Sequence, residues 1–245
     1  MGSGLWVQAA YINHSCMPNS MHTFYGDLLV LRATRNISAG EEITFAYTPL
    51  SYDVDERQGR FQQTWGFVCS CHLCSLELGS TSRVYRHRLI QEFDRNLAHL
   101  KQQGEDTYIS ALEDVVAALR GMYEEDKAYN NMPKLGLVKY AHALLTHYQA
   151  RQDAGKTIRY SLEVLRGLGF QVDSENGHMT KFSNANAVFA PSERPTEIVQ
   201  AFVGLADGLE AAGRRGTDFE WLARQAFMIT TGGDNDDFFA MYRTP

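Results

Sequence analysis

Cysteine and proline are scarce in this sequence, which holds four cysteines and six prolines among 245 residues. It also lacks an apolar run of the roughly 18–20 residues that cross a bilayer, so we expect no membrane partner. The first residues, MGSGLWVQAA, lack the charged start and the long apolar stretch of a secretory signal. These absences predict a protein of the nucleus, the cytoplasm or both, where structural disulfides are rare.

An excess of positive charge is missing as well, because 23 lysines and arginines stand against 29 acidic residues and give a net charge of −6. Proteins that bind nucleic acid use clustered lysines and arginines to neutralise phosphates. The composition therefore predicts no direct nucleic-acid partner. An apolar content of 44% is ordinary for a globular protein with one large domain or two smaller ones.

The four cysteines are distributed unevenly along the chain. Cys69, Cys71 and Cys74 lie together in the segment VCSCHLCS, and Cys16 is the only other one. The C-x-C-x-x-C spacing favours a metal site over a disulfide framework. Closely spaced thiolates bind tetrahedral zinc at little cost in loop closure. Cys16 is the better candidate for the fourth ligand, and the neighbouring His72 is the alternative, with more awkward geometry.

Three motifs in this order resemble the C-terminal half of a SET domain, the catalytic domain of a lysine methyltransferase family. YINHSCMPN at residues 11–19 is similar to the family signature NHSCxPN, and GEEITFAY at residues 40–47 resembles GEELTxxY. The cysteine cluster resembles the post-SET zinc segment, whose fourth ligand in the family is the cysteine of NHSC. The resemblance is strong over residues 5–75. Beyond them, the helical tail resembles only loosely the SET-MYND and fungal branch with a TPR-like tail.

The resemblance implies a methyltransferase that uses S-adenosyl-L-methionine and carries a structural zinc. Asn13, His14 and Phe67 would contact the cofactor, and the hydroxyl of Tyr47 would align donor and acceptor. The partner would be a protein or peptide with a substrate lysine, in a histone or another protein. Tyr52 is a candidate for the lysine channel, and Trp65 stands where related SET-MYND proteins usually carry a tyrosine.

The chemistry explains why such residue types are needed. A lysine must lose its proton before it can accept a methyl group, although its ordinary pKa is about 10.4. Burial in an apolar channel and a nearby positive sulfonium both favour the neutral amine. Positioning then carries most of the catalysis, and no strong base is required.

The predicted elements give an α+β fold. Residues 1–67 would form the short-stranded, β-rich C-terminal half of a SET domain with a knot-like crossing, 68–80 the zinc segment, and 81–245 an α-helical, TPR-like domain. We expect a hairpin at 21–25 and 28–32, a strand at 43–47 and a possible helix at 57–64. Apolar residues recur at helical spacing in six later segments, namely 84–100, 109–123, 135–149, 157–167, 197–212 and 218–230. The Ser-, Asn- and Gly-rich segment 171–195 is predicted to be a long loop.

Two further expectations concern the whole site. The helical tail follows the cysteines with little linker, so we expect it to form one wall of a cleft that faces Tyr47. Only twelve residues precede Asn13, whereas a SET domain usually begins earlier with a glycine-containing loop that grips the cofactor. We therefore expect that this chain alone binds the cofactor weakly or not at all and shows little methyl transfer. The alternative function is a non-catalytic protein-interaction module held together by zinc.

Overall fold

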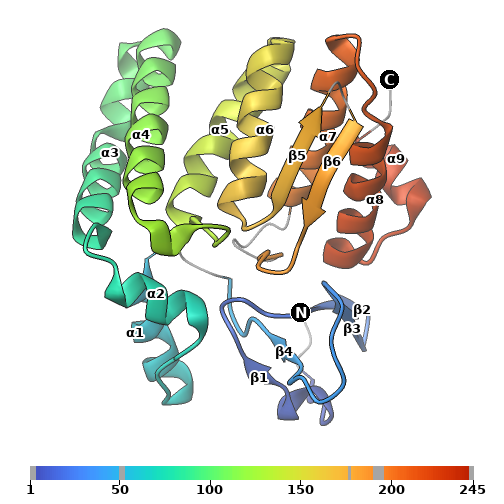
Figure 1. Cartoon of the computed structure of the whole chain (residues 1–245). Helices are drawn as coiled ribbons and strands as arrows, with labels where there is room; N and C mark the ends of the chain where they lie inside the picture. The colour runs from blue at the N-terminus through green and yellow to red at the C-terminus, as the bar shows by residue number, and fades with distance from the viewer. Residues whose placement is uncertain (1–3, 50–52, 176–177, 190–195, 243–245) are drawn as a thin grey trace.

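The computed structural model describes residues 4–49, 53–175, 178–189 and 196–242. Short strands, loops and two helices from the first 79 residues lie in the lower half of Figure 1, and an array of longer helices lies above them. None of the described helices is both long enough and apolar enough to cross a membrane.

The strands of the lower part come in two pairs. β2 (Ser20–Tyr25) and β3 (Leu28–Ala33) form an antiparallel hairpin, and Gly26 in its turn has a φ of 58°. Such two-residue loops often need a positive φ, which glycine adopts without strain. This confirms the predicted hairpin. The much shorter β1 (Asn13–His14) pairs in parallel with β4 (Thr44–Phe45), which brings the two sequence motifs side by side.

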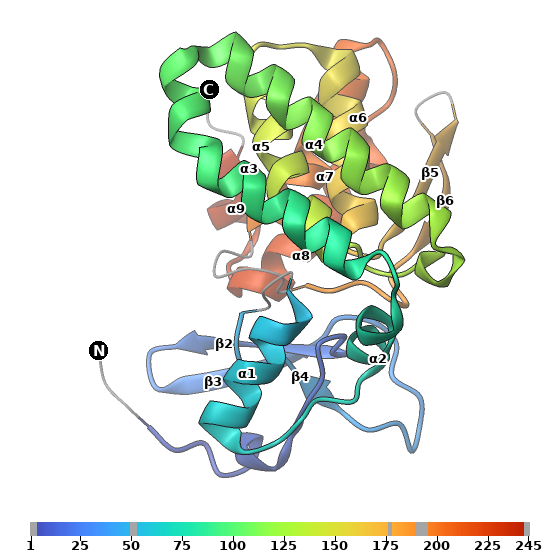
Figure 2. The same cartoon turned by 90° about the vertical axis from the view of Figure 1, so that its left-hand side faces the viewer.

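Helices α1 (Val54–Trp65) and α2 (His72–Gly79) flank the cysteine segment. The carboxylate of Asp53 accepts a hydrogen bond from the backbone N–H of Glu56 and so caps the start of α1. Gly66 ends α1 in the left-handed conformation, with φ 72°. Figure 2 shows α1 and α2 below the lower end of α3.

The upper part consists of consecutive helices packed side by side (Figure 1). They are α3 (Arg83–Gln103), α4 (Glu105–Glu125), α5 (Leu135–Ala150), α6 (Ala154–Gly167), α7 (Thr196–Ala211), α8 (Thr217–Thr231) and α9 (Asn235–Tyr242). Two short 3₁₀ turns, Ala9–Tyr11 and Lys127–Tyr129, lie outside these elements. Each predicted helix is present, and most of its ends lie within a few residues of the prediction. The prediction succeeds because buried apolar side chains recur on one face of each helix. The likeness to TPR repeats stays a prediction.

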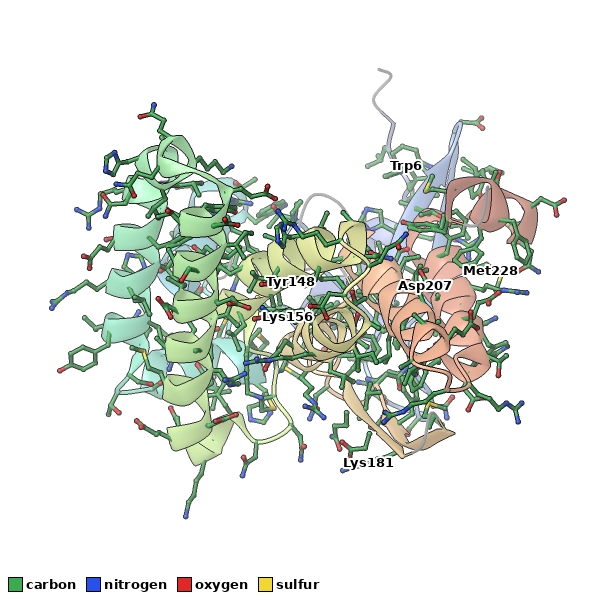
Figure 3. The ribbon with its side chains drawn as sticks, turned by 90° about the horizontal axis from the view of Figure 1, so that it is seen from above. Trp6, Tyr148, Lys156, Lys181, Asp207 and Met228 are labelled. Carbon is green, nitrogen blue, oxygen red and sulfur yellow. The ribbon has the colours of Figure 1, made fainter. Side chains whose placement is uncertain are left out.

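A polar network joins α4 to the α5–α6 pair. The carboxylate of Glu113 accepts hydrogen bonds from the hydroxyls of Tyr148 (3.0 Å) and Tyr160 (2.9 Å) and from the ammonium of Lys156 (3.1 Å). Figure 3 shows Tyr148 and Lys156 near each other in the middle of the array, and their polar atoms are 2.8 Å apart. Together with the ion pair of Arg120 on α4 and Glu163 on α6, the network helps to fix the register of these three helices.

The prediction of a loop at residues 171–195 is wrong for its first half. β5 (Gln171–Glu175) and β6 (His178–Ser183) form an antiparallel hairpin with an irregularity at Asp173 and Ser174. Val172 is buried opposite Phe182, and this apolar pair faces the helical core. Tertiary burial of a few apolar side chains therefore overrides a composition typical of loops. Residues 190–195 lie outside the described residues.

The two parts contact each other at the β2–β3 hairpin. β2 lies beneath α8 in Figure 1, and the side-chain amide of Asn184 donates a hydrogen bond to the carbonyl of Thr34 over 2.8 Å. Gly232, which ends α8 with φ 76°, lies against the ring of Tyr25. A side chain at position 232 would clash with that ring as well as strain the backbone.

Candidate functional site

The four cysteine sulfurs converge at one point of the lower part. They lie within 4.8 Å of one another, and the Sγ of Cys16 is 4.0 Å from that of Cys69 and 3.5 Å from that of Cys74. Zinc–sulfur bonds of about 2.3 Å in a tetrahedron place the sulfurs about 3.8 Å apart. All four cysteines are free thiols, and three are buried. The cluster therefore fits zinc, with Cys16 rather than His72 completing the set.

Local structure explains how three of these cysteines reach one point. Cys71 is the N-cap of α2, and Cys74 lies in the first turn of that helix. The partial positive charge of a helix start favours thiolates there. The side-chain amide of Gln58 on α1 holds the backbone of Cys69 from both sides, since it accepts from the Cys69 N–H (2.8 Å) and donates to the Cys69 carbonyl (2.6 Å).

A buried ion pair supports the cluster from behind. Arg57 on α1 pairs with Glu77 on α2, and both side chains are at most 5% exposed. The guanidinium of Arg57 also lies 3.8 Å from the Sγ of Cys74. Burial raises the pKa of the Glu77 carboxyl, and the positive charge of Arg57 opposes that shift. The arginine places positive charge next to sulfurs that carry negative charge when they bind a metal.

Beside the cysteine cluster lies a cavity of about 780 Å³, within the usual range for small-molecule sites. Asn13, His14, Tyr47 and Phe67 all line it, so the fold brings together the residues that the sequence singled out for the cofactor and for catalysis. The amide of Asn13 donates to a carboxylate oxygen of Glu42 over 2.6 Å. The only arginine or lysine among the described lining residues is Arg35, which pairs with Glu41 at 2.5 Å.

Aromatic rings form the inner wall of this cavity. The ring of Phe67 stacks on that of Phe61 with centroids 5.3 Å apart, and His14 lies 4.2 Å from Phe61. Tyr47 packs against Trp65 at 5.4 Å and edge-on against Phe67 at 6.2 Å. Tyr47, Trp65 and Phe67 thus give the cavity an aromatic side, which suits a stacked heterocycle.

The hydroxyl of Tyr47 is held in one position. It donates a hydrogen bond to the carbonyl of Ile12 over 2.9 Å, and the backbone N–H of Tyr47 donates to Nδ1 of His14 over 3.2 Å. Burial raises the pKa of the Tyr47 phenol, with a further contribution from the negative charge of Glu42. The hydroxyl is therefore protonated at neutral pH and acts as a hydrogen-bond donor.

A second cavity, of about 620 Å³, lies on the other side of Tyr47 and Trp65, which line both cavities. Its described lining is mainly apolar and includes Trp6, Phe24 and Phe45. No described residue after position 72 lines either cavity. The expectation that the helical tail forms a wall of the cleft at Tyr47 is therefore wrong for the described linings. The tail contacts the hairpin, α1 and the cysteine core instead. Tyr52 lies outside the described residues.

Sequence reasoning missed several residues that shape the site, above all Asn19. This amide is 2% exposed and holds the second motif in place through three hydrogen bonds. It accepts from the Thr44 N–H (2.9 Å) and donates to the Glu42 carbonyl (2.8 Å) and to the Glu41 carboxylate (3.0 Å). Hydrogen bonds from Arg35, from a backbone N–H and from Asn19 lower the pKa of the Glu41 carboxyl to about 2.

We expect Asn19→Ala to lower the free energy of unfolding by about 2 kcal/mol, because it leaves the half-buried Thr44 N–H without its acceptor. Chemical denaturation followed by tryptophan fluorescence measures the change. Asn36→Ala is the matched control, since Asn36 is exposed in the same part of the chain. Equal midpoints for the two variants would contradict the role of Asn19.

Comparison with known proteins relates the first part of this chain to a known domain. Residues 2–48 match the family model of the SET domain. The relatives of this chain include proteins named N-lysine methyltransferase.

Three relatives show the extent of the similarity. This chain is 27% identical over 125 residues to N-lysine methyltransferase SMYD2 of Gallus gallus. The alignment covers 51% of this chain and 26% of the relative. Over 89 residues, or 36% of this chain, it is 37% identical to SMYD2-A of Xenopus laevis and 35% identical to a methyltransferase of Gibberella zeae. These alignments span 21% and 12% of the two relatives. The matched region is thus about a quarter or less of each relative's length.

Proposed function

We propose that this chain contributes the cofactor and catalytic site of a protein-lysine methyltransferase that uses S-adenosyl-L-methionine. The two cavities that meet at Tyr47 carry this proposal. A methyltransferase must hold a donor and an acceptor on opposite sides of one reacting point. Here a polar cavity with an aromatic wall and a mainly apolar cavity share only Tyr47 and Trp65 among their described linings.

The polar cavity is the proposed cofactor side. Bound S-adenosyl-L-methionine would supply a sulfonium methyl group. Phe67 would stack on its base, and Asn13 and His14 line the same wall. The carboxylate of Glu42 holds the Asn13 amide, so binding must keep or exchange that hydrogen bond.

The apolar cavity is the proposed lysine side. The side-chain methylenes of a lysine would pack on its aromatic rings, and low polarity would favour the neutral amine. With a cofactor bound, the neutral amine would displace the sulfur from the methyl carbon, and the surplus proton would leave to water. Tyr47, fixed through the Ile12 carbonyl, would set the direction of approach.

The cysteine cluster is the proposed structural zinc site. Bound zinc would join Cys16 of the first motif to the segment that contains Cys69, Cys71 and Cys74. The helical part, TPR-like in this proposal, offers a surface for the protein substrate. A histone or another protein of the nucleus or cytoplasm is the proposed class of substrate.

Titration calorimetry with S-adenosyl-L-methionine tests the cofactor site. We expect saturable but weak binding, in the millimolar range, because Arg35 is already paired and no other arginine or lysine of the described lining meets the cofactor's carboxylate. Phe67→Ala should weaken binding by about tenfold through the lost stacking. Phe239→Ala, on α9, is the control and should leave the affinity unchanged.

Two outcomes would count against the proposal. Absence of saturable binding at high cofactor concentration would favour the non-catalytic interaction module. Equal affinities for Phe67→Ala and the unaltered chain would show that the cofactor binds elsewhere.

A further inference from the structure

The imidazole of His14 touches both the cysteine cluster and the backbone of Tyr47. Its Nε2 lies 3.3 Å from the Sγ of Cys16, and its Nδ1 lies 3.2 Å from the amide nitrogen of Tyr47. The half-buried ring is held by Phe61, with centroids 4.2 Å apart, and by the Tyr47 ring at 5.3 Å. One side chain therefore connects the proposed metal centre with the proposed catalytic residue.

The direction of both hydrogen bonds follows from the chemistry of the partners. A backbone N–H can only donate, so Nδ1 accepts from Tyr47 and carries no proton. The neutral ring then has its proton on Nε2, which faces Cys16. A metal-bound thiolate is an acceptor, so the two contacts require the same tautomer and support each other.

The contact with Tyr47 lies where the strand pairing stops. β1 ends at His14 and β4 ends at Phe45, with the N–H of Ser15 donating to the Phe45 carbonyl over 3.3 Å. The next N–H that could continue this pairing belongs to Tyr47, and the His14 ring accepts it in place of a backbone carbonyl. The position of Tyr47 therefore depends on where this ring is held.

We propose that His14 is a positioning residue that couples metal binding at the four cysteines to the placement of Tyr47. With the metal bound, the Cys16 thiolate holds Nε2–H and fixes the ring, and Nδ1 then fixes the backbone of Tyr47. Loss of the metal frees the ring and loosens Tyr47. The role in catalysis rests on the proposed function, whereas the coupling itself depends only on the cysteine cluster.

Two substitutions separate the contacts. The side chain in His14→Asn places an oxygen near the position of Nδ1, so it keeps an acceptor for Tyr47 but does not reach Cys16. The longer side chain in His14→Gln places an N–H near the position of Nε2, so it keeps a donor for Cys16. Both variants lose the aromatic ring, and their difference therefore reports the hydrogen bonds rather than ring packing.

Zinc affinity and exchange of the Tyr47 amide hydrogen are the two readouts, both in zinc-loaded protein without cofactor. His14→Asn should lower zinc affinity by about 10–100-fold, as is typical when a partner of a metal ligand is lost. It should change Tyr47 exchange by less than about threefold. His14→Gln should do the reverse, with zinc affinity almost unchanged and Tyr47 exchange faster by about tenfold.

The same two substitutions at His72 are the matched control. His72 is exposed and stands between two of the cysteines, but its ring has neither of the contacts described for His14. We expect no change in either readout. Nitrogen-15 spectra of the zinc-loaded protein should also show the His14 proton on Nε2.

A proton on Nδ1, or equal changes in both His14 variants, would overturn the coupling. These readouts require neither cofactor nor methyl acceptor. If the cofactor fails to bind while the variants separate as expected, the coupling stands and the proposed function falls. If the cofactor binds and the variants do not separate, only the coupling is wrong.

Discussion

Cys71→Ser should lower the zinc content from one ion per chain to well below one. In this variant the lower part of the molecule should unfold before the helical part. Cys71 is the most exposed of the four cysteines, so its replacement tests metal binding more than core packing. Structural zinc contributes on the order of 10–16 kcal/mol to the folding of small sites, and a site with three ligands retains only part of it.

The separation of two apolar cores explains why the effect should be local. The smaller buried cluster contains Cys16, Cys69 and Cys74 together with five apolar side chains, of which only Leu135 and Val188 come from the helical part. The larger cluster lies almost wholly in the helical part. Without metal, the smaller core keeps only a few buried apolar side chains around its thiols, whereas the helices keep a much larger core of their own.

Metal analysis and hydrogen exchange resolved by segment measure the two effects. The control is Ser70→Ala, which alters an exposed side chain between two cysteines. Full zinc content in Cys71→Ser would contradict the four-cysteine site. Simultaneous unfolding of both parts would contradict the separate cores.

Tyr47→Phe should reduce methyl transfer by about 100-fold while cofactor affinity stays within about twofold of the original value. The phenyl ring keeps its packing against Trp65 and Phe67, but the hydrogen bond from the hydroxyl to the Ile12 carbonyl is lost. Binding and reaction therefore separate, because the hydroxyl orients the reactants rather than holding the cofactor.

Transfer of a radiolabelled methyl group to a mixed protein substrate such as histones, at several cofactor concentrations, measures this loss. Tyr11→Phe is the matched control, because Tyr11 lies at the start of the first motif, next to Ile12, but is 83% exposed and lines neither cavity. Unchanged transfer by Tyr47→Phe, or a loss explained entirely by weaker cofactor binding, would contradict the assigned role.

Local signals in the sequence were sufficient for much of the fold. The turn at Gly26 and Asp27 between apolar runs predicted the β2–β3 hairpin, and apolar spacing predicted the helices after residue 83. The sequence predicts a loop at residues 171–183, because the strands found there are stabilised by contacts with helices distant in the sequence. The buried faces of Val172 and Phe170 supply those contacts.

For the site, the motifs identified the residue types, but several supporting residues had no local signal. The motif NHSCxPN includes Asn19 as its last residue. It does not indicate that Asn19 forms hydrogen bonds with residues 41–44. Phe61 lies seven positions after Val54, so both lie on the buried face of α1. Most other residues of this helix are polar, and the apolar spacing is therefore a weak signal. The partnership of Arg57 with Glu77 spans twenty positions, which no periodicity reports.

The sequence by itself indicated which four cysteines lie together and which motif residues line one cavity, because reactive side chains at close spacing carry their chemistry with them. Only the tertiary structure decided that Tyr47 stands between two cavities, that His14 faces both Cys16 and Tyr47, and that the helices pack on the hairpin and not on the cleft. Those relations depend on contacts between segments that lie far apart in the chain. Burial and hydrogen bonding across the whole fold select them, and no local pattern encodes them.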